Sequence, residues 1–220
     1  MVGRERLDLE VSDSDAIGVL LALLAGYLAG SIPSGYWIVR AFAHTDIRRH
    51  GSGNIGATNV LRTAGRVPGV VTLLGDVAKG WIAVAVAGRI GGDAPSVLAA
   101  GAVAAVVGNC WSIFLGFRGG KGAATGLGAL LRLVPLPTLA ALPVFIVVVV
   151  TTRFVSLGSL LAALCVPFGA WALGAPRPAV LGALGAAAIV ILRHHENITR
   201  LLAGTERRFG ERGGAEAAAP

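Results

Sequence analysis

Ala123-Ala-Thr-Gly-Leu-Gly-Ala-Leu-Leu131 is a short apolar stretch that lies between Lys121 and Arg132. It carries no charge, but it is shorter than the roughly 17–25 residues that a helix needs to cross a bilayer core. Whether it crosses the membrane sets the side on which every later loop lies. The topology of the whole chain therefore depends on this stretch.

Longer uncharged runs lie on both sides of it, at 17–39, 94–117, 133–152, 154–175 and 178–192. Most are long enough to span a bilayer, the last only with its flanking residues. Of the 220 residues, 55% are hydrophobic and 14% are charged, whereas a soluble domain has about 25% charged residues. Acidic residues precede the first run, which argues against a secretory signal. The chain is predicted to be an all-α integral membrane protein.

We expect seven transmembrane helices, one of them short, in a single membrane-embedded domain at residues 16–206. Residues 1–15 should form a polar arm, and residues 207–220 a basic, Ala- and Gly-rich tail that is disordered. Gly and Ala are frequent in all the helical segments, which favours close helix packing in a membrane. The helices are expected at about 16–39, 68–90, 95–115, 123–131, within 133–152, 155–173 and 178–193.

Positive charge falls mainly on one side of the membrane if residues 123–131 cross it. The other side keeps only Arg4, Arg6, Arg89, Arg132 and Arg177. Cytoplasmic loops are enriched in Lys and Arg, so the basic side should be cytoplasmic and the amino terminus outside, with the carboxyl terminus inside. The basic side carries Arg40, Arg48, Arg49, Arg62, Arg66, Arg118, Lys121, Arg153, Arg193, Arg200, Arg207, Arg208 and Arg212.

The net charge of +7 does not indicate a nucleic-acid partner. Nucleic-acid binding needs a soluble basic face, whereas these arginines lie in short loops between apolar runs. Phosphate-bearing small molecules and membrane lipids are the expected partners. Cys110 and Cys165 each lie alone in an apolar stretch, so we expect small buried hydrophobes there, and neither a disulfide nor a metal site.

The first basic loop reads Asp46-Ile-Arg-Arg-His-Gly-Ser-Gly-Asn-Ile-Gly-Ala-Thr-Asn-Val-Leu-Arg62. Its glycines allow tight turns that present N–H groups to an anion. The Ser52 hydroxyl can donate a hydrogen bond, and the arginines can hold a phosphate through two hydrogen bonds each. A flexible polar linker is the alternative. It is disfavoured because the same design recurs in the next basic loop.

That loop reads Phe117-Arg-Gly-Gly-Lys-Gly-Ala-Ala-Thr125 and opens directly onto the short helix. A glycine-rich turn before a helix N-terminus presents unpaired N–H groups to phosphate, and Lys121 adds a positive charge. It is not a Walker A loop, because Leu115 stands where the first glycine should be and Gly122 follows the lysine. Nucleotide hydrolysis is therefore disfavoured, while a plain turn remains the alternative.

The third polar segment reads Arg193-His-His-Glu-Asn-Ile-Thr-Arg-Leu-Leu-Ala-Gly-Thr-Glu206. If the last helix continues, His194 and Asn197 share a face with Leu201. A histidine at the membrane surface can act as an acid, a base or a hydrogen-bond donor. The alternative is a basic segment that binds anionic lipid headgroups.

Two smaller features involve buried polar residues. Asp76 and Lys79 lie three apart in one membrane helix, and we expect an ion pair that holds this helix in register rather than a catalytic role. Ser156 and Ser159 follow Arg153 at the start of another helix. We expect Ser156 to cap that helix.

These segments together resemble the PlsY family, the membrane acyl-phosphate:glycerol-3-phosphate acyltransferases of bacterial phospholipid synthesis. The similarity runs in family order from residue 30 to about residue 206 and includes Gly30-Ser-Ile-Pro-Ser34 and Asp76-x-x-Lys79-Gly besides the three polar segments. The family usually has Gly-His before the Gly-Gly-Lys loop. Here the stretch reads Gly108-Asn109, and an asparagine cannot act as a base there.

The resemblance implies seven helices with three cytoplasmic motifs and assigns roles to their residues. The residues expected to serve catalysis are Ser52, Arg62, His194 and Asn197. Those expected to bind phosphate or line its pocket are Gly51, Gly53, Asn54, Gly119, Gly120, Lys121, Gly122 and Ser159. Those expected to support the fold are Asp76, Lys79 and Glu206.

The expected reaction transfers an acyl group from acyl phosphate to the sn-1 hydroxyl of glycerol 3-phosphate, giving lysophosphatidic acid, the first acylation of phospholipid biosynthesis. An acyl phosphate has a good leaving group, so no covalent nucleophile is needed, and neither a G-x-S-x-G elbow nor an H-x4-D pattern occurs. We expect no cofactor. A soluble enzyme that forms acyl phosphate is a further partner implied by the resemblance, as is a location in the bacterial inner membrane.

The proton acceptor stays open between a substrate phosphate oxygen and His194. A transporter or binder of a phosphorylated solute is the alternative function, and it predicts ligand-binding residues at midplane depth. A small scaffold for other enzymes would not need the glycine-rich loops.

Overall fold

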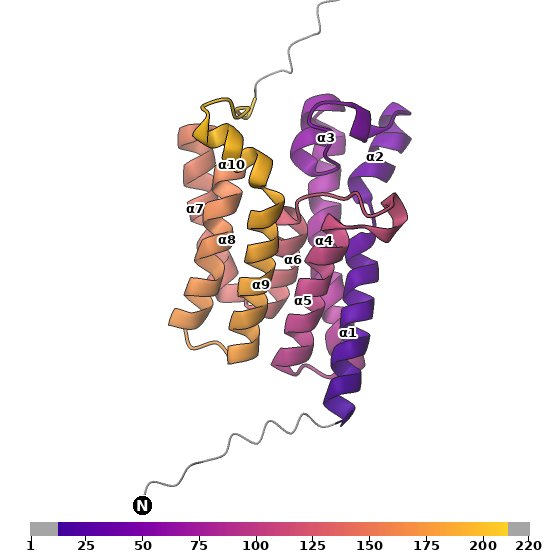
Figure 1. The fold of residues 1–220 in the computed structure, drawn as a ribbon, viewed down its shortest axis with the longest axis vertical. Coiled ribbons are helices and arrows are strands. Elements are labelled where there is room, and N and C mark those ends of the chain that lie inside the picture. Colours follow the sequence, from indigo (N-terminus) through magenta and orange to yellow (C-terminus); the bar gives the residue numbers. More distant parts are fainter. Residues whose placement is uncertain (1–12, 211–220) are drawn as a thin grey trace, which may run out of the picture.

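The computed structural model describes residues 13–210, and every regular element among them is a helix (Figure 1). The predicted arm and tail therefore lie largely outside the described residues. The elements are α1 (Asp13–Ser31), α2 (Ser34–Ala43), η1 (Ile47–Arg49), α3 (Ala57–Thr63), α4 (Arg66–Gly91), α5 (Pro95–Cys110), η2 (Ile113–Leu115), α6 (Ala123–Leu133), α7 (Pro135–Thr152), α8 (Val155–Ala172), α9 (Arg177–Arg193) and α10 (His195–Leu202).

Five of the described segments are long and apolar enough to cross a membrane. They are the α1–α2 segment, α4, the segment from α5 to η2, α7 and α8. The bent pair α9–α10 makes a sixth if it counts as one span, and α6 is a shorter apolar helix. The all-α architecture expected from the sequence is confirmed for the described residues.

The first predicted helix, 16–39, is wrong as a continuous helix because α1 ends at Ser31 and α2 begins at Ser34. Pro33 has no amide hydrogen, and its ring clashes with the preceding helical turn. Buried side chains satisfy the freed carbonyls. The Ser31 oxygen accepts from Ser112 Oγ at 2.5 Å, and the Ile32 oxygen accepts from Lys79 Nζ at 2.8 Å.

The third predicted helix, 95–115, also ends early, at Cys110. The chain then folds back on the last turn of α5, where Gly119 N–H donates to the Cys110 oxygen at 3.2 Å and Gly120 N–H to the Asn109 oxygen at 2.8 Å. This backbone pairing holds the loop of residues 111–122 against the end of α5 and sets the start of α6.

The short helix α6 joins the two ends of the bundle. At its start, Lys121 hydrogen-bonds to Asn197, which lies on α10. Near its end, Arg132 forms a 2.7 Å ion pair with Asp93, in the loop between α4 and α5. Its 11 residues extend only about 16 Å, about half the thickness of a bilayer core.

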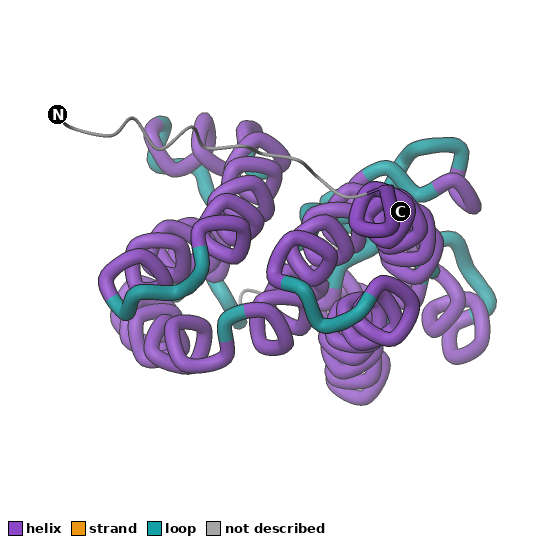
Figure 2. The backbone as a smooth tube through the Cα atoms, turned by 90° about the horizontal axis from the view of Figure 1, so that it is seen from below, coloured by secondary structure: helices purple, strands orange, loops and turns teal. Residues whose placement is uncertain are grey.

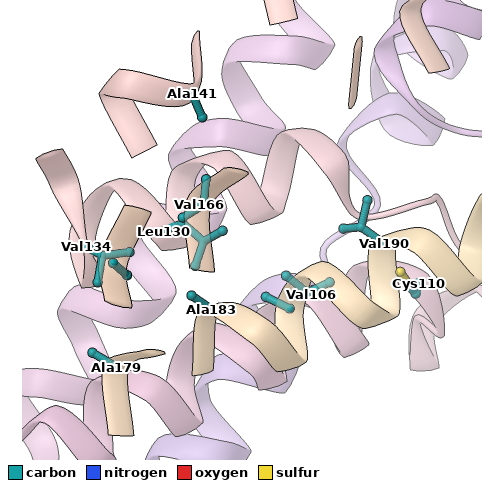
Figure 3. Close-up of a cluster of buried hydrophobic side chains, with 11 residues drawn as sticks. Val106, Cys110, Leu130, Val134, Ala141, Val166, Ala179, Ala183 and Val190 are labelled. Atoms are coloured by element: carbon teal, nitrogen blue, oxygen red, sulfur yellow. The ribbon is translucent and has the colours of Figure 1, made fainter. Parts of the chain in front are cut away.

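The helices pack side by side in the view from below (Figure 2). Helices α1, α4, α5 and α6 contact one another, α7 packs on α8, and α9 joins the two groups through α5 and α8. Small and branched apolar side chains fill the junction, among them Val106, Leu130, Val166, Ala183 and Val190 (Figure 3).

Glycines bring α4 and α6 into backbone contact. A Cβ atom on Gly128 would lie 1.9 Å from the Val77 oxygen, and one on Gly80 would lie 2.0 Å from the Thr125 oxygen. No side chain fits at either position without moving a helix. This crossing fixes the depth of α6 and, with it, the position of Lys121.

Replacing Gly128 by Ala should therefore destabilise the protein by about 1–3 kcal/mol, because the added methyl group collides with backbone atoms. Thermal unfolding in detergent measures the effect. Gly126→Ala on the same helix is the control, because its Cβ would meet only side-chain atoms at 3.6 Å and beyond. Equal unfolding temperatures for the two variants would contradict the backbone contact.

Candidate active site

A cavity of about 790 Å³ lies between the α3–α4 side of the bundle and helices α7 to α10. Its polar part is lined by residues from all three polar segments, among them Ser52, Arg62, Lys121, His194 and Asn197. Its apolar part continues between the helices and is lined by Leu130, Leu142, Phe145, Val166 and Val190, among others. One space therefore joins a cationic end to an apolar end.

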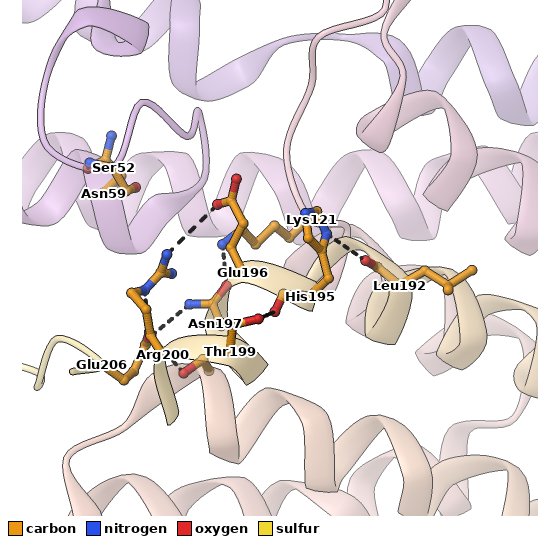
Figure 4. Close-up of polar contacts among 11 residues, drawn as sticks. Ser52, Asn59, Lys121, Leu192, His195, Glu196, Asn197, Thr199, Arg200 and Glu206 are labelled. Carbon is orange, nitrogen blue, oxygen red and sulfur yellow. Dashed lines mark hydrogen bonds and ion pairs between the residues drawn. The ribbon is translucent and has the colours of Figure 1, made fainter. Parts of the chain in front are cut away.

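Buried Asn59 organises the first polar loop. Its Oδ1 accepts from Ser52 N–H at 2.9 Å, and its Nδ2 donates to the Asn54 and His50 oxygens at 2.8 and 3.1 Å. Gly51 and Gly53 adopt positive φ angles of 61° and 71°, which favour glycine. Figure 4 shows Ser52 beside Asn59. The sequence showed several polar residues in this loop but did not distinguish Asn59 as its anchor.

Lys121 reaches the third polar segment. Its Nζ donates to Asn197 Oδ1, and Asn197 Nδ2 in turn donates to Glu206 Oε1 at 2.6 Å (Figure 4). Burial of the ammonium, together with the positive charge of Arg200, lowers the pKa of Lys121. The first turn of α6 lies next to it without a side-chain cap, and its residues Gly122 and Ala123 line the cavity.

The last membrane helix does not continue straight through His194. α9 ends at Arg193, and α10 follows with a bend of 59°. His194 Nδ1 lies 2.7 Å from the Val190 oxygen. Because a carbonyl can only accept, we assign the hydrogen to Nδ1, which leaves Nε2 as an acceptor in the neutral ring. The bend keeps both His194 and Asn197 in the cavity wall.

Glu206 receives hydrogen bonds from three residues on two helices, α8 and α10. Besides Asn197, Ser156 Oγ donates to Oε1 at 2.9 Å and Arg200 Nε donates to Oε2 at 2.8 Å. The prediction that Ser156 caps α8 is wrong, because its hydroxyl binds this distant carboxylate. Burial of the carboxylate alone would raise the pKa of Glu206, but these hydrogen bonds outweigh it and lower the pKa.

Asp76 and Lys79 form the predicted ion pair, with Nζ 2.8 Å from Oδ1, and both side chains are buried. Ser34 Oγ also donates to Asp76 Oδ1. Lys79 donates to the Ile32 oxygen and to Asn109 Oδ1, each at 2.8 Å. The pair therefore lies in a polar network that connects α2, α4 and α5.

Contrary to the prediction from the sequence, two glycines of the second loop do not present their N–H groups to a ligand. The N–H groups of Gly119 and Gly120 are bonded to α5, so they do not face a ligand. Gly53 and Gly119 line a second pocket of about 520 Å³ beside Arg48, Arg49 and Arg118. Gly120 and Lys79 line neither space. The remaining predicted residues line the main cavity: Gly51, Ser52, Asn54, Arg62, Asp76, Lys121, Gly122, Ser159, His194, Asn197 and Glu206.

Asn54 and Ser159 also have partners within the protein. Asn54 Oδ1 accepts from Gly56 N–H at 2.8 Å, and Ser159 Oγ donates to the Val155 oxygen at 2.9 Å. Cys110 and Cys165 are both free thiols, the first buried and the second partly exposed.

The family model described as glycerol-3-phosphate acyltransferase matches residues 20–204. The chain belongs to the glycerol-3-phosphate acyltransferase family. It is 47% identical over 196 residues to a family member from Synechococcus sp. (strain JA-3-3Ab), covering 89% of this chain and 96% of the relative. It is 51% identical over 191 residues to a member from Geobacter sulfurreducens, covering 86% and 97%.

Two solved structures of PlsY (YgiH), an integral membrane glycerol 3-phosphate acyltransferase, share the fold. The glycerol 3-phosphate form superposes with a TM-score of 0.82 at 38% identity, covering 87% of this chain and 96% of the other. The lysophosphatidic acid form gives 0.79 at 37% identity, covering 87% and 95%. This member of the glycerol-3-phosphate acyltransferase family is therefore a multi-pass membrane enzyme, an acyltransferase.

Replacing Glu206 by Gln should destabilise the folded protein by about 1–3 kcal/mol at neutral pH, because a charged hydrogen-bond acceptor is lost. The native pKa of Glu206 is lowered, so its contribution is complete above the pKa of an unfolded glutamate and is lost as the pH falls through the native pKa. The difference in unfolding temperature between the two proteins should therefore shrink below about pH 4.

The control is Glu196→Gln, since Glu196 is exposed and lies 3.9 Å from the same Arg200. An exposed pair of this kind contributes little, about 0–1 kcal/mol. A Glu206→Gln variant as stable as this control at neutral pH would show that the network does not support the fold.

Proposed function

We propose that this enzyme transfers an acyl group from acyl phosphate to the sn-1 hydroxyl of glycerol 3-phosphate and releases lysophosphatidic acid and phosphate. One observation carries the proposal: the cavity has a cationic end and an apolar end in one continuous space. Lysophosphatidic acid has the same division, with a phosphate group at one end and an acyl chain at the other.

The phosphate groups would bind at the polar end. Arg62 and Lys121 provide positive charge there, and the uncapped first turn of α6 provides N–H groups and the positive end of its dipole. The hydroxyl of Ser52 lies in the same wall. The acyl chain would lie along the apolar lining between α7, α8 and α9.

The reaction needs no covalent enzyme intermediate. The sn-1 oxygen attacks the acyl carbonyl carbon, the bond from that carbon to the bridging phosphate oxygen breaks, and the hydroxyl proton leaves with the phosphate or passes first to His194 Nε2. The protein contributes by holding two anionic substrates together and by stabilising the negative charge that develops on the carbonyl oxygen.

We infer that the chain crosses the bacterial inner membrane seven times, with the amino terminus outside and the polar segments in the cytoplasm. The contacts of Lys121 with Asn197 and of Arg132 with Asp93, at opposite ends of α6, support a short seventh crossing. A soluble enzyme that makes acyl phosphate would act from the same side, and membrane lipids would surround the apolar helices.

A transporter of a phosphorylated solute is less well supported. The charged residues deep in the bundle are Asp76 and Lys79, and protein groups occupy both of them. The helix break at Pro33 likewise has its carbonyls bonded to side chains. Among the described residues, neither charged group at that depth is left to bind a solute.

The direct test is to incubate the purified protein with acyl phosphate and labelled glycerol 3-phosphate and to measure labelled lysophosphatidic acid. Product from acyl phosphate but not from acyl-CoA supports the proposed donor, and the reverse result overturns it. Lys121→Met should lower kcat/KM by about 10²–10³-fold, because a cation at the developing charge is lost. Arg132→Gln, at the other end of α6, is the matched control.

The proton acceptor is tested with His194→Ala. Near-normal kcat in this variant would leave the substrate phosphate as the acceptor and exclude His194. A loss of about 10²-fold or more, with unfolding temperature preserved, would support His194 Nε2.

The proposed topology predicts which loops an impermeant thiol reagent can label. In a protein with Cys110 and Cys165 replaced by Ala, Arg118→Cys should react only when the reagent reaches the cytoplasmic face. Arg177→Cys should react only from the opposite face, because an odd number of crossings separates the two loops. Labelling of both positions from one face would exclude the seven-crossing arrangement.

A further inference from the structure

Asn109, in the last turn of α5, has an amide group whose orientation is determined by a buried charge. The side chain is buried, with 6% of its surface exposed. Lys79 Nζ lies 2.8 Å from the Asn109 atom assigned as Oδ1. An ammonium group can only donate, so the atom facing it must be the carbonyl oxygen. The NH₂ group of Asn109 therefore points away from Lys79.

This NH₂ group hydrogen-bonds to no other group among residues 13–210, although Asn109 lines the main cavity. Gly120 lies next to this NH₂ group and has no side chain to cover it. A Cβ atom at Gly120 would lie only 2.9 Å from Asn109 Nδ2. Buried polar groups in native proteins nearly always have a partner. Asn109 is more than nine-tenths buried, and its donor lacks a protein partner beside the cavity, which indicates that a ligand supplies the acceptor.

The position of the donor suggests which ligand atom it meets. The Asn109 backbone oxygen accepts from Gly120 N–H at 2.8 Å, so the amide lies directly beside the residue that precedes Lys121. Lys121 contacts α10 at the polar end, whereas Asn109 belongs to a membrane helix. In an acyl phosphate, the carbonyl group lies between the phosphate and the acyl chain. If the phosphate binds near Lys121 and the acyl chain lies in the apolar part of the cavity, the carbonyl oxygen is the acceptor expected between them.

We propose that Asn109 Nδ2 donates a hydrogen bond to the carbonyl oxygen of the acyl phosphate and stabilises the oxyanion that forms during acyl transfer. This rests on the proposed acyl-phosphate reaction. As the sn-1 oxygen adds to the carbonyl carbon, the electron pair of the C=O bond moves onto the oxygen facing Asn109. It returns to carbon when the bond to the phosphate oxygen breaks. Asparagine neither gains nor loses a proton in this step, so its role is that of a donor and not of a base.

Asn109→Asp tests the role, because it replaces Nδ2 by oxygen and keeps an oxygen facing Lys79. Steady-state kinetics with acyl phosphate and glycerol 3-phosphate should show a kcat about 10²–10³-fold lower, the effect of removing one oxyanion donor. In Asn109→Ala, which adds no negative charge beside the anionic substrates, the KM of each substrate should change by less than about threefold, because the donor acts mainly in the transition state. A kcat within about threefold of the unchanged enzyme, or a loss confined to KM, overturns the proposal.

Asn109→Ala removes the same donor and gives the same test if the aspartate variant does not fold. Ser112→Ala is the matched control: Ser112 is buried just after α5 and bonds to the Ser31 oxygen, away from the cavity lining. It should lower the unfolding temperature and leave kcat within about threefold. A fall in its kcat as large as that of the Asn109 variants would show that damage to this junction explains their loss.

The unchanged enzyme separates the two proposals. If it forms no lysophosphatidic acid from acyl phosphate, the proposed function fails. If it is active and an Asn109 variant that folds is equally active, only the role of Asn109 fails.

Discussion

The ammonium group of Lys79 connects two places where the chain leaves regular helix geometry with an acidic side chain on its own helix. It donates to the Ile32 oxygen at the break between α1 and α2, pairs with Asp76 within α4, and donates to Asn109 at the end of α5. A lysine inside a membrane protein is tolerated only when its charge and its hydrogens have partners. Here Asp76 on the same helix supplies the charge partner, and two helix ends supply the hydrogen-bond acceptors. The same contacts therefore satisfy the buried charge and hold α2, α4 and α5 in one arrangement.

This arrangement of α2, α4 and α5 also determines the position of the loop that carries Lys121. Asn109 is both an acceptor for Lys79 and, through its backbone oxygen, an acceptor for Gly120. The position of Lys121 thus depends on the ion pair inside the bundle, although the two lysines serve different purposes. The glycine contacts of α4 with α6 place the other side of the same loop. The loop lysine proposed to bind phosphate is in this way held by rigid helices, which is what a preorganised site requires.

The sequence was sufficient to predict the apolar spans, the three polar segments and the Asp76–Lys79 pair, since each depends on local composition or on helical spacing. It was insufficient at Pro33, because hydropathy does not distinguish one apolar helix from two, although Gly30-Ser-Ile-Pro-Ser34 contains the proline that breaks it. Ser156 illustrates a second limit. Capping is a local interaction that spacing predicts, whereas its actual partner, Glu206, lies 50 positions away in the chain.

The glycines of the second loop show a third limit, because one residue type serves two purposes. Glycine exposes N–H groups to an anion, but it also permits backbones to approach closely. Gly119 serves the second purpose, since a Cβ atom there would lie 2.1 Å from the Asn109 oxygen. The sequence contains no signal that separates these purposes; only the tertiary contact does.

The charges around the cavity favour an anion as the ligand beside Lys121. Asp76 is already paired with Lys79, and Glu206 is bound by Arg200. Lys121 is held by a neutral amide, and its lowered pKa reflects burial near another cation. A bound phosphate would reverse that condition by placing negative charge beside the ammonium. The proposed affinity for a phosphorylated substrate thus has a physical basis, because the half-buried Lys121 ammonium forms no direct ion pair among the described residues.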